Sequence, residues 1–183
     1  MTILGIDPGL QGGLVLLSED RRILEREVMP VVTVAVKRRR EGRIVNGSKG
    51  TLDRARLRML LAAWAPGHII LEQTGVRPGE SGTSALTIGI GWGILYMAIS
   101  TYPHETVPPA SWTKAMLGGT PATADPKDRA RLACASLWPR ESFKATDRCR
   151  KAHSGLCDAA LLAEWGRRRL AGGNVAREVD EIA

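Results

Sequence analysis

Three carboxylates in this chain lie at the edges of apolar segments, where acidic side chains can build a metal site. Asp7 and Glu72 each end a short apolar segment, and Asp158 begins one rich in alanine and leucine. A carboxylate beside an apolar core is costly unless it is paired or bound to a metal. Mg²⁺ prefers oxygen ligands, and two such ions can activate water and stabilise the leaving oxygen of a phosphodiester. The residue types therefore predict phosphodiester hydrolysis, provided that the fold brings the three acids together.

Taken singly, each acid also has an ordinary structural explanation. Asp7 precedes Pro8-Gly9, a common turn sequence, and Glu72 is compatible with a surface position at the end of a strand. The elements that carry the acids therefore decide between the two explanations.

The segments around these acids read as an α/β sequence. Apolar residues 3–6, 13–17 and 23–36 predict three strands in an antiparallel meander, with the third interrupted at Pro30. Apolar positions at helical spacing predict a helix over residues 51–64, and a strand over residues 68–72 follows. A helix between two strands indicates a parallel crossover.

The second half of the chain predicts helices around one more strand. The longest apolar stretch, residues 85–99, is too short and too rich in glycine to span a bilayer, so it predicts a buried helix. The remaining expectations are a strand over 104–107, a helix from 109 to 116, a helix from 126 to 138 with Asp125 as its N-cap, a basic loop over 140–151 and a helix over 156–170.

The chain is basic and of one-domain size. It has 183 residues, with 26 Lys and Arg against 19 Asp and Glu, for a net charge of +7. This favours a polyanionic partner, although a merely soluble basic protein has the same balance. Aromatic residues make up 4%, so phosphate contacts should dominate over base stacking. The basic residues 37–43, which end near the turn sequence Asn46-Gly47, predict an exposed loop.

Three cysteines do not make a disulfide framework, and no secretory signal is recognisable, so we expect a cytoplasmic protein that does not enter membranes. Cys149, His153 and Cys157 are spaced by four, which would suit zinc on a helix, but Gly155 weakens that helix and no fourth ligand is evident. A small buried residue is the simpler interpretation of Cys134 and Cys157.

Several motifs, in order, resemble the RuvC-type Holliday junction resolvases, particularly the phage-type members. They are Ile3-Leu4-Gly5-Ile6-Asp7-Pro8-Gly9 with Gly12-Gly13, Ile69-Ile70-Leu71-Glu72-Gln73, the glycine-bearing helix from Ser84, Val107-Pro108-Pro109 with Trp112-Thr113-Lys114, the helix over 127–139, and residues 151–163. The resemblance implies a ribonuclease H-like α/β fold over residues 1–172, with a mixed five-stranded sheet flanked by helices. A frayed tail is expected over 173–183.

The resemblance also implies an activity. The family consists of homodimers that resolve four-way DNA junctions by paired symmetric nicks, with two Mg²⁺ ions in each active site and Mn²⁺ as a possible substitute. Asp7 would bridge the two ions, Glu72 would be a ligand and Asp158 would complete the site. The implied setting is the cytoplasm of a bacterium or of a phage-infected host.

The fourth ligand departs from the family pattern. Phage-type relatives carry an aspartate shortly before the last acid, and Ser154 stands at that position here, with His153 beside it. His153 is our choice of fourth catalytic and metal-binding residue, since a neutral imidazole can bind metal or orient water. Contact with phosphate or solvent alone is the other interpretation of His153.

The resemblance assigns DNA contacts to Lys114, Lys127 and Lys151, which lie within its motifs, and Arg77 is a candidate for the junction centre. Three alternatives remain open. They are a non-catalytic DNA-binding protein on the same fold, a nuclease for other branched DNA, and a relative of the sugar kinase and actin-like ATPases, which need two such domains.

Overall fold

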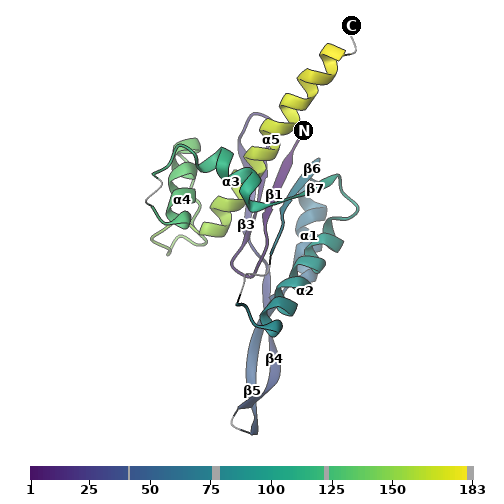
Figure 1. Ribbon diagram of the computed structural model, residues 1–183, viewed down its shortest axis with the longest axis vertical. Coiled ribbons are helices and arrows are strands. Elements are labelled where there is room, and N and C mark those ends of the chain that lie inside the picture. The colour runs from purple at the N-terminus through teal and green to yellow at the C-terminus, as the bar shows by residue number, and fades with distance from the viewer. Residues whose placement is uncertain (41, 76–78, 122–123, 181–183) are drawn as a thin grey trace.

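The computed structural model describes residues 1–40, 42–75, 79–121 and 124–180, and it describes their side chains except at residues 38, 40 and 173–180. A five-stranded sheet has the order β3-β2-β1-β6-β7, and a separate two-stranded hairpin, β4–β5, projects from it (Figure 1). The strands are β1 (Ile3–Asp7), β2 (Gly13–Leu17), β3 (Ile23–Val28), β4 (Val31–Arg40), β5 (Arg43–Leu52), β6 (His68–Glu72) and β7 (His104–Val107).

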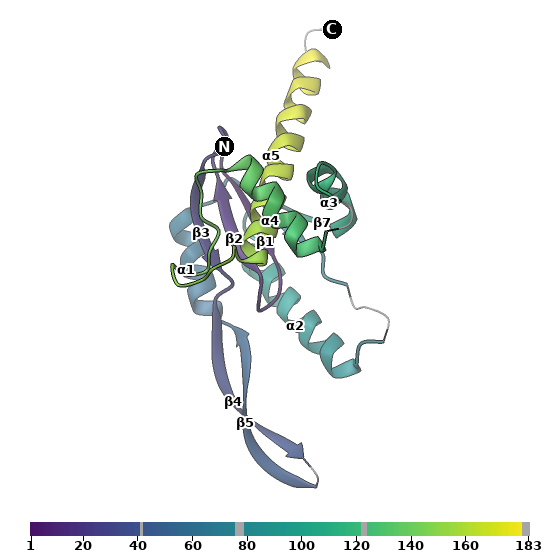
Figure 2. The ribbon, with the colours of Figure 1, turned by 90° about the vertical axis from the view of Figure 1, so that its left-hand side faces the viewer.

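Helices cover both faces of the sheet (Figures 1 and 2). They are α1 (Arg54–Trp64), α2 (Gly82–Ile99), α3 (Pro109–Leu117), α4 (Pro126–Leu137) and α5 (Ser154–Asp180). Helix α5 packs on β1 and β2, with α3 and α4 against it, while α1 and α2 lie on the other face. Successive β1 residues point to opposite faces, so Ile3 enters one core and Leu4 the other.

The sheet confirms the predicted mixed topology. Strand β1 pairs antiparallel with β2 and parallel with β6, and the crossover between β1 and β6 contains α1, as expected. Asp125 accepts a hydrogen bond from the Lys127 backbone N–H at 2.9 Å and caps α4, whose first residue is Pro126. Helix α5 continues past Gly172 to Asp180. The domain boundary at residue 172 stays a prediction.

Two glycines allow α5 to lie directly on the sheet. A Cβ atom on Gly5 of β1 would collide with the Ala159 carbonyl oxygen and would lie 2.7 Å from the Ala163 nitrogen. A Cβ atom on Gly155 would lie 2.7 Å from the Gly12 Cα. These contacts are with backbone atoms, which cannot move aside as a side chain would. The first turns of α5 are therefore held against β1 and the turn that follows it.

The prediction of an exposed loop over residues 37–43 is wrong. Strands β4 and β5 pair in continuous register from Val31↔Leu52 to Arg40↔Arg43, and Gly42 in the turn has a φ of 78°. Asn46 and Gly47 lie inside β5 instead of forming the turn. Pro30 does not interrupt one strand but separates β3 from β4, and residues 51 and 52 belong to β5 and not to the first helix.

The prediction that the apolar helix is buried is also wrong. Of α2, only Leu95 and Ile99 are buried, and Leu86, Ile90 and Met97 are 65%, 56% and 70% exposed. By length and composition alone, α2 could cross a membrane, although one such helix is weak evidence. Its apolar residues lie all around the helix, so only one side can reach the sheet core.

Gly5→Ala should lower the free energy of unfolding by about 1–3 kcal/mol, because the added methyl group forces α5 away from β1. Chemical denaturation followed by circular dichroism would measure the change. Gly172→Ala is the matched control. It also replaces a glycine within a helix by alanine, but its Cβ atom meets no atom within 4 Å. Equal stability of Gly5→Ala and the wild type would contradict this account of the packing.

Candidate active site

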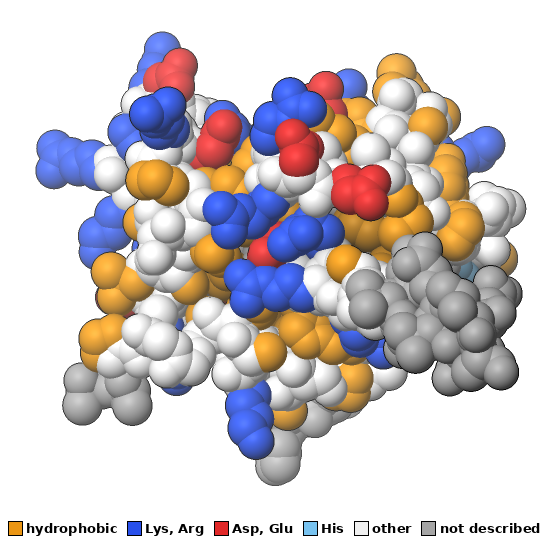
Figure 3. Space-filling view, turned by 90° about the horizontal axis from the view of Figure 1, so that it is seen from above, with side chains coloured by type: hydrophobic (Ala, Val, Ile, Leu, Met, Phe, Trp, Pro, Cys, Tyr) orange, Lys and Arg blue, Asp and Glu red, His pale blue; other side chains and the backbone are white. Residues whose placement is uncertain are grey.

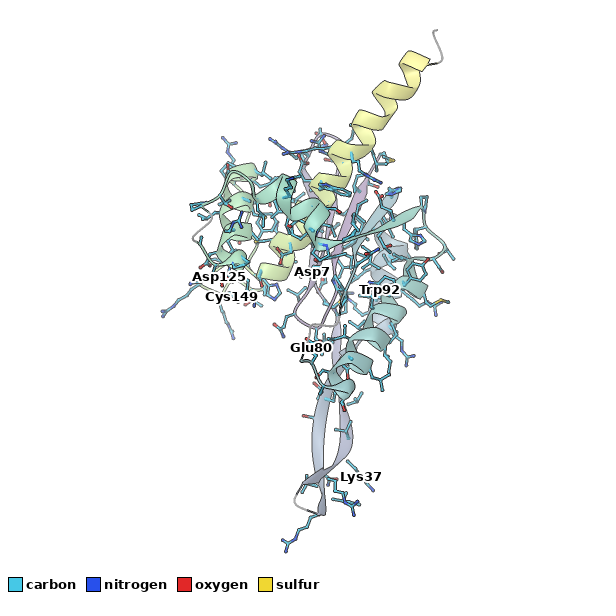
Figure 4. All side chains as sticks on the ribbon, in the orientation of Figure 1. Asp7, Lys37, Glu80, Trp92, Asp125 and Cys149 are labelled. Carbon is cyan, nitrogen blue, oxygen red and sulfur yellow. The ribbon has the colours of Figure 1, made fainter. Side chains whose placement is uncertain are left out.

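The sheet and α5 bring Asp7, Glu72 and Asp158 together. Parallel pairing of Ile6 with Leu71 places the next residues, Asp7 and Glu72, side by side at the carboxyl end of β1 and β6. Asp158 is the fifth residue of α5, in the part held against β1 by Gly5 and Gly155. Figure 4 shows Asp7 in the middle of the body, where β1 ends.

Burial and mutual repulsion govern the protonation of these carboxyls. Burial raises the pKa of Asp7 well above its usual range, and the charges of Asp158 and Glu72 raise it further. Burial, with a contribution from Asp158, raises the pKa of Glu72 to about 7. Burial also raises the pKa of Asp158 to about 6. The three acids therefore share one electrostatic site, in which negative charge is costly.

Two basic side chains of α4 act on this site. Lys127 lowers the pKa of Asp7 and of Asp158, and Arg131 also lowers that of Asp158, but burial outweighs both. The two residues are four apart, so they lie on the same face of α4. Lys127 is exposed, and Arg131 donates to the Ala152 carbonyl oxygen at 2.8 Å. Positive charge thus borders the acids without forming an ion pair with them in the part of the chain that the structure describes.

A buried acid elsewhere in α5 shows what a structural role looks like. Glu164 is fully buried, and Arg167 and Arg168 each form an ion pair with it at 2.7 Å. Burial acts to raise the pKa of Glu164, but these two partners outweigh it and the pKa is lowered. Asp7, Glu72 and Asp158 have no such partners among the described residues. Their charges remain uncompensated in a protein that pairs the fully buried Glu164.

The donor set suits a hard divalent cation. All three acids offer carboxylate oxygens, and a cation would offset the cost of burying their charges and the repulsion that further raises the pKa of Asp7 and of Glu72. Across the described ranges, no three His, Cys, Asp or Glu side chains are yet close enough together to hold a metal ion. The carboxylates fit Mg²⁺ or Mn²⁺ by chemistry and charge, and binding would require their side chains to close around the ion.

His153 stands immediately before α5, and its carbonyl oxygen accepts the Cys157 N–H at 3.1 Å. Burial and the charge of Arg131 lower the pKa of His153, which favours the neutral imidazole that binds metals. Its Nδ1 atom is buried and has no hydrogen-bond partner among the described residues. The side chain lines an open groove with Gln11 and Glu27, a groove that the three acids do not line.

The predicted DNA-binding lysines have different surroundings. Lys127 lies beside the acids, as described above. Lys114 is exposed in the last turn of α3, and Lys151 is exposed in the loop before α5. Arg77 lies outside the described residues. Cys134 and Cys157 are buried and Cys149 is free, so the three cysteines form no disulfide.

Sequence reasoning missed Arg131 and Trp112 as site residues. Arg131 could have been found from its spacing, four residues after Lys127 on the same predicted helix. Trp112 is buried, and its indole N–H acts to lower the pKa of Glu72, although burial of Glu72 outweighs this effect. Trp112 lies in the motif Trp112-Thr113-Lys114. A tryptophan is usually a core residue, so its residue type alone did not indicate that it acts on Glu72.

Without divalent cations, stability should fall as the pH rises from 4.5 through about 7. The folded-state pKa of Glu72 lies above its unfolded value, so the folded state binds more protons in that window. Glu72→Gln should flatten this dependence and melt at a higher temperature than the wild type at pH 8. Thermal unfolding in EDTA at several pH values would measure both effects.

Mg²⁺ at pH 8 should raise the melting temperature of the wild type but not of Glu72→Gln, because a cation stabilises only clustered, charged carboxylates. Glu25→Gln, on the exposed part of β3, is the control and should behave as the wild type does. A melting temperature that Mg²⁺ raises equally in all three proteins would contradict a cation site at Glu72.

Comparisons with known proteins were made by sequence and by structure. No protein-family model matches the chain, and neither does any curated protein. Among solved structures, T. thermophilus RuvC in complex with a Holliday junction substrate has a TM-score of 0.54 at 17% identity, covering 94% of this chain and 96% of that one. Another structure of Thermus thermophilus RuvC has a TM-score of 0.50 at 18% identity, covering 94% and 97%.

The yeast mitochondrial Holliday junction resolvase Ydc2 is more distant, with a TM-score of 0.49 at 14% identity over 91% of this chain and 77% of that one. The two RuvC structures show that this chain has the RuvC fold, which is ribonuclease H-like. The predicted fold class is thereby confirmed.

Proposed function

We propose that this protein is a divalent-metal-dependent DNA endonuclease that resolves four-way junctions. The observation that carries the proposal is the cluster of Asp7, Glu72 and Asp158, half-buried and without an ion-pair partner among the described residues, at the carboxyl end of two parallel strands. The RuvC fold supports it, since one RuvC structure holds a Holliday junction substrate. The basic net charge of +7 agrees with a nucleic-acid substrate.

Asp7, Glu72 and Asp158 would hold two Mg²⁺ ions, with His153 as the fourth ligand. Bound ions of this kind activate water and stabilise the leaving oxygen of a phosphodiester. Lys127 and Arg131, whose charges act on the acids, would attract the phosphate toward them. Lys114, Lys151 and Arg77 are proposed to hold the flanking DNA through phosphate contacts.

We propose further that the protein acts as a homodimer that makes paired nicks, with α2 as the contact between subunits. Leu86, Ile90 and Met97 form an exposed stripe on α2, and Gly93 lies on the same stripe, where an added Cβ would meet nothing within 4 Å. Symmetric cleavage of two strands requires two active sites, and the described residues of each chain provide one cluster of this kind, Asp7, Glu72 and Asp158. A second copy of α2 is therefore the occupant that we propose for this face.

Asp7→Asn should abolish cleavage of a labelled four-way junction in Mg²⁺ while leaving junction binding intact, because the amide cannot replace a bridging carboxylate. Symmetric nicks by the wild type in the junction, but not in a linear duplex or in EDTA, are the expected reference result. A Y-fork in the same assay separates junction resolution from action on other branched DNA.

Asp147→Asn, an exposed aspartate of the loop before α5, is the matched control and should cleave normally. Cleavage by Asp7→Asn at the wild-type rate would refute the assignment of the metal site. Binding of the junction by the wild type without nicks in either Mg²⁺ or Mn²⁺ would instead favour a non-catalytic DNA-binding protein.

Ile90→Glu should convert the dimer to a monomer in sedimentation velocity experiments, because a buried interfacial charge is costly. The same variant should no longer make paired nicks, although Asp7, Glu72 and Asp158 are unchanged in it. Leu132→Glu, at a 50% exposed leucine of α4, is the control and should remain dimeric. A wild-type protein that sediments as a monomer at micromolar concentration with junction DNA would rule out the dimer.

A further inference from the structure

The β4–β5 hairpin is the most basic segment of the protein. Its residues 31–52 carry six Lys and Arg and one Glu, so the hairpin holds a net charge of +5 out of the +7 of the whole chain. Four of the basic residues are consecutive, from Lys37 to Arg40. Like charges concentrated in one ribbon repel one another, and an external polyanion removes that repulsion.

The hairpin places these charges far from the body. Each strand has ten residues, which corresponds to a ribbon roughly 33 Å long. Both views show it extending along the long axis from the main sheet (Figures 1 and 2), and Lys37 lies near its tip (Figure 4). Lys37, Arg39 and Arg43 are exposed, and in the described part of the chain none of them forms an ion pair.

Positive charge occupies both faces of the outer half of the hairpin. Lys37 and Arg39 are two residues apart in β4 and so share a face, opposite Asn46 and Ile44. Arg43 pairs in register with Arg40, which puts it on the other face. A two-stranded ribbon fits the major groove of B-DNA, where phosphates lie on both sides of it.

The base of the hairpin is fixed to the catalytic end of the sheet. Just before β4, the Met29 N–H donates to the Gly12 carbonyl oxygen at 3.0 Å, in the turn that follows Asp7. Just after β5, the Asp53 N–H donates to the Pro30 carbonyl oxygen at 2.9 Å, which closes the base of the hairpin. Lys49 also donates to the Thr87 hydroxyl of α2 at 3.1 Å. The ribbon therefore has a defined direction relative to the acids.

The opposite end of the molecule has a different charge pattern. Figure 3 views that end and shows acidic side chains among the basic ones. Several basic groups there are paired, namely Met1 with Glu19, Arg22 with Asp20, Arg167 and Arg168 with Glu164, and Arg169 with Glu105. Lys37, Arg39 and Arg43 of the hairpin, in contrast, have no ion-pair partner among the described residues, and the hairpin begins beside the turn that follows Asp7.

We infer that the β4–β5 hairpin is a DNA-binding arm that lies along a duplex arm of the substrate, beyond the phosphodiester that is hydrolysed at the acids. The inference rests on the proposed action on branched DNA and adds a binding surface to it. A ribbon of about 33 Å reaches along about 10 base pairs of B-DNA. The contacts are with phosphates, so the arm contributes affinity and orientation and not sequence preference.

The test compares Lys37→Gln/Arg39→Gln with the matched control Arg21→Gln/Arg140→Gln. Arg21 and Arg140 are exposed at the other end of the sheet and form no ion pair within the described residues. Binding of four-way junctions in EDTA would be measured by fluorescence anisotropy at several salt concentrations. Thermal unfolding of both variants would verify that each remains folded.

Near 0.1 M salt, the affinity of the hairpin variant for the junction should be at least roughly 10-fold lower than that of the wild type. Its slope of log affinity against log salt should be shallower by about 2, because each of the two lost phosphate contacts contributes about 0.9. The control should change neither. Lys37→Arg/Arg39→Lys, which keeps both charges, should bind as the wild type does. With junction arms of about 6 base pairs, shorter than the ribbon, the deficit of the hairpin variant should shrink.

Equal binding by the hairpin variant and the control would overturn the inference. If, in addition, the hairpin variant aggregated, the role of Lys37 and Arg39 in the wild type would be to prevent pairing between exposed strand edges. A deficit that persists in full on short arms would overturn the placement along a duplex. If the wild type cleaves junctions and the hairpin variant binds them normally, the DNA-binding arm is refuted and the proposed nuclease stands. If the hairpin variant binds more weakly but the wild type cleaves no junction, only the proposed nuclease is refuted.

Discussion

The close approach of α5 to β1 is the constraint on which the site depends. Gly5 and Gly155 leave no room for a side chain, so the helix backbone lies against the strand and the turn that follows it. That contact carries Asp158 to Asp7 and Glu72 and leaves all three only partly exposed to water. The raised pKa values of the three acids follow from this burial, and they express a free-energy cost that the uncomplexed fold bears.

The same protein treats its acids in two ways within one helix. Glu164 lies six residues beyond Asp158 and is neutralised by two arginines of its own helix. The basic residues nearest to Asp158 belong to α4, and they remain too weakly coupled to offset burial. A cluster left uncompensated in this manner is arranged for a ligand that supplies positive charge, and a divalent cation is the simplest ligand of that kind.

The two surfaces that project from the sheet differ in chemistry. The β4–β5 hairpin is basic at its outer half, whereas α2 exposes leucine, isoleucine and methionine. A cavity of about 300 Å³ lies between them, lined by Leu10, Thr51 and Ile90 among others, next to the turn that follows Asp7. Charge on one projection and apolar surface on the other are what the proposed DNA arm and the proposed subunit contact each require.

The sequence by itself determined the local elements that carry the acids. Apolar runs that end in Asp7 and Glu72 are strands, and Asp125-Pro126 begins a helix, because these signals act over a few residues. It did not determine the hairpin, since residues 37–43 read as a loop until β4 and β5 are seen to pair. Nor did it show that α2 is mostly exposed, because hydrophobicity records the tendency to leave water and not which neighbour is available. Only the tertiary structure decided that Arg131 and Trp112 border the acids, since burial and charge coupling arise between segments that the chain order keeps apart.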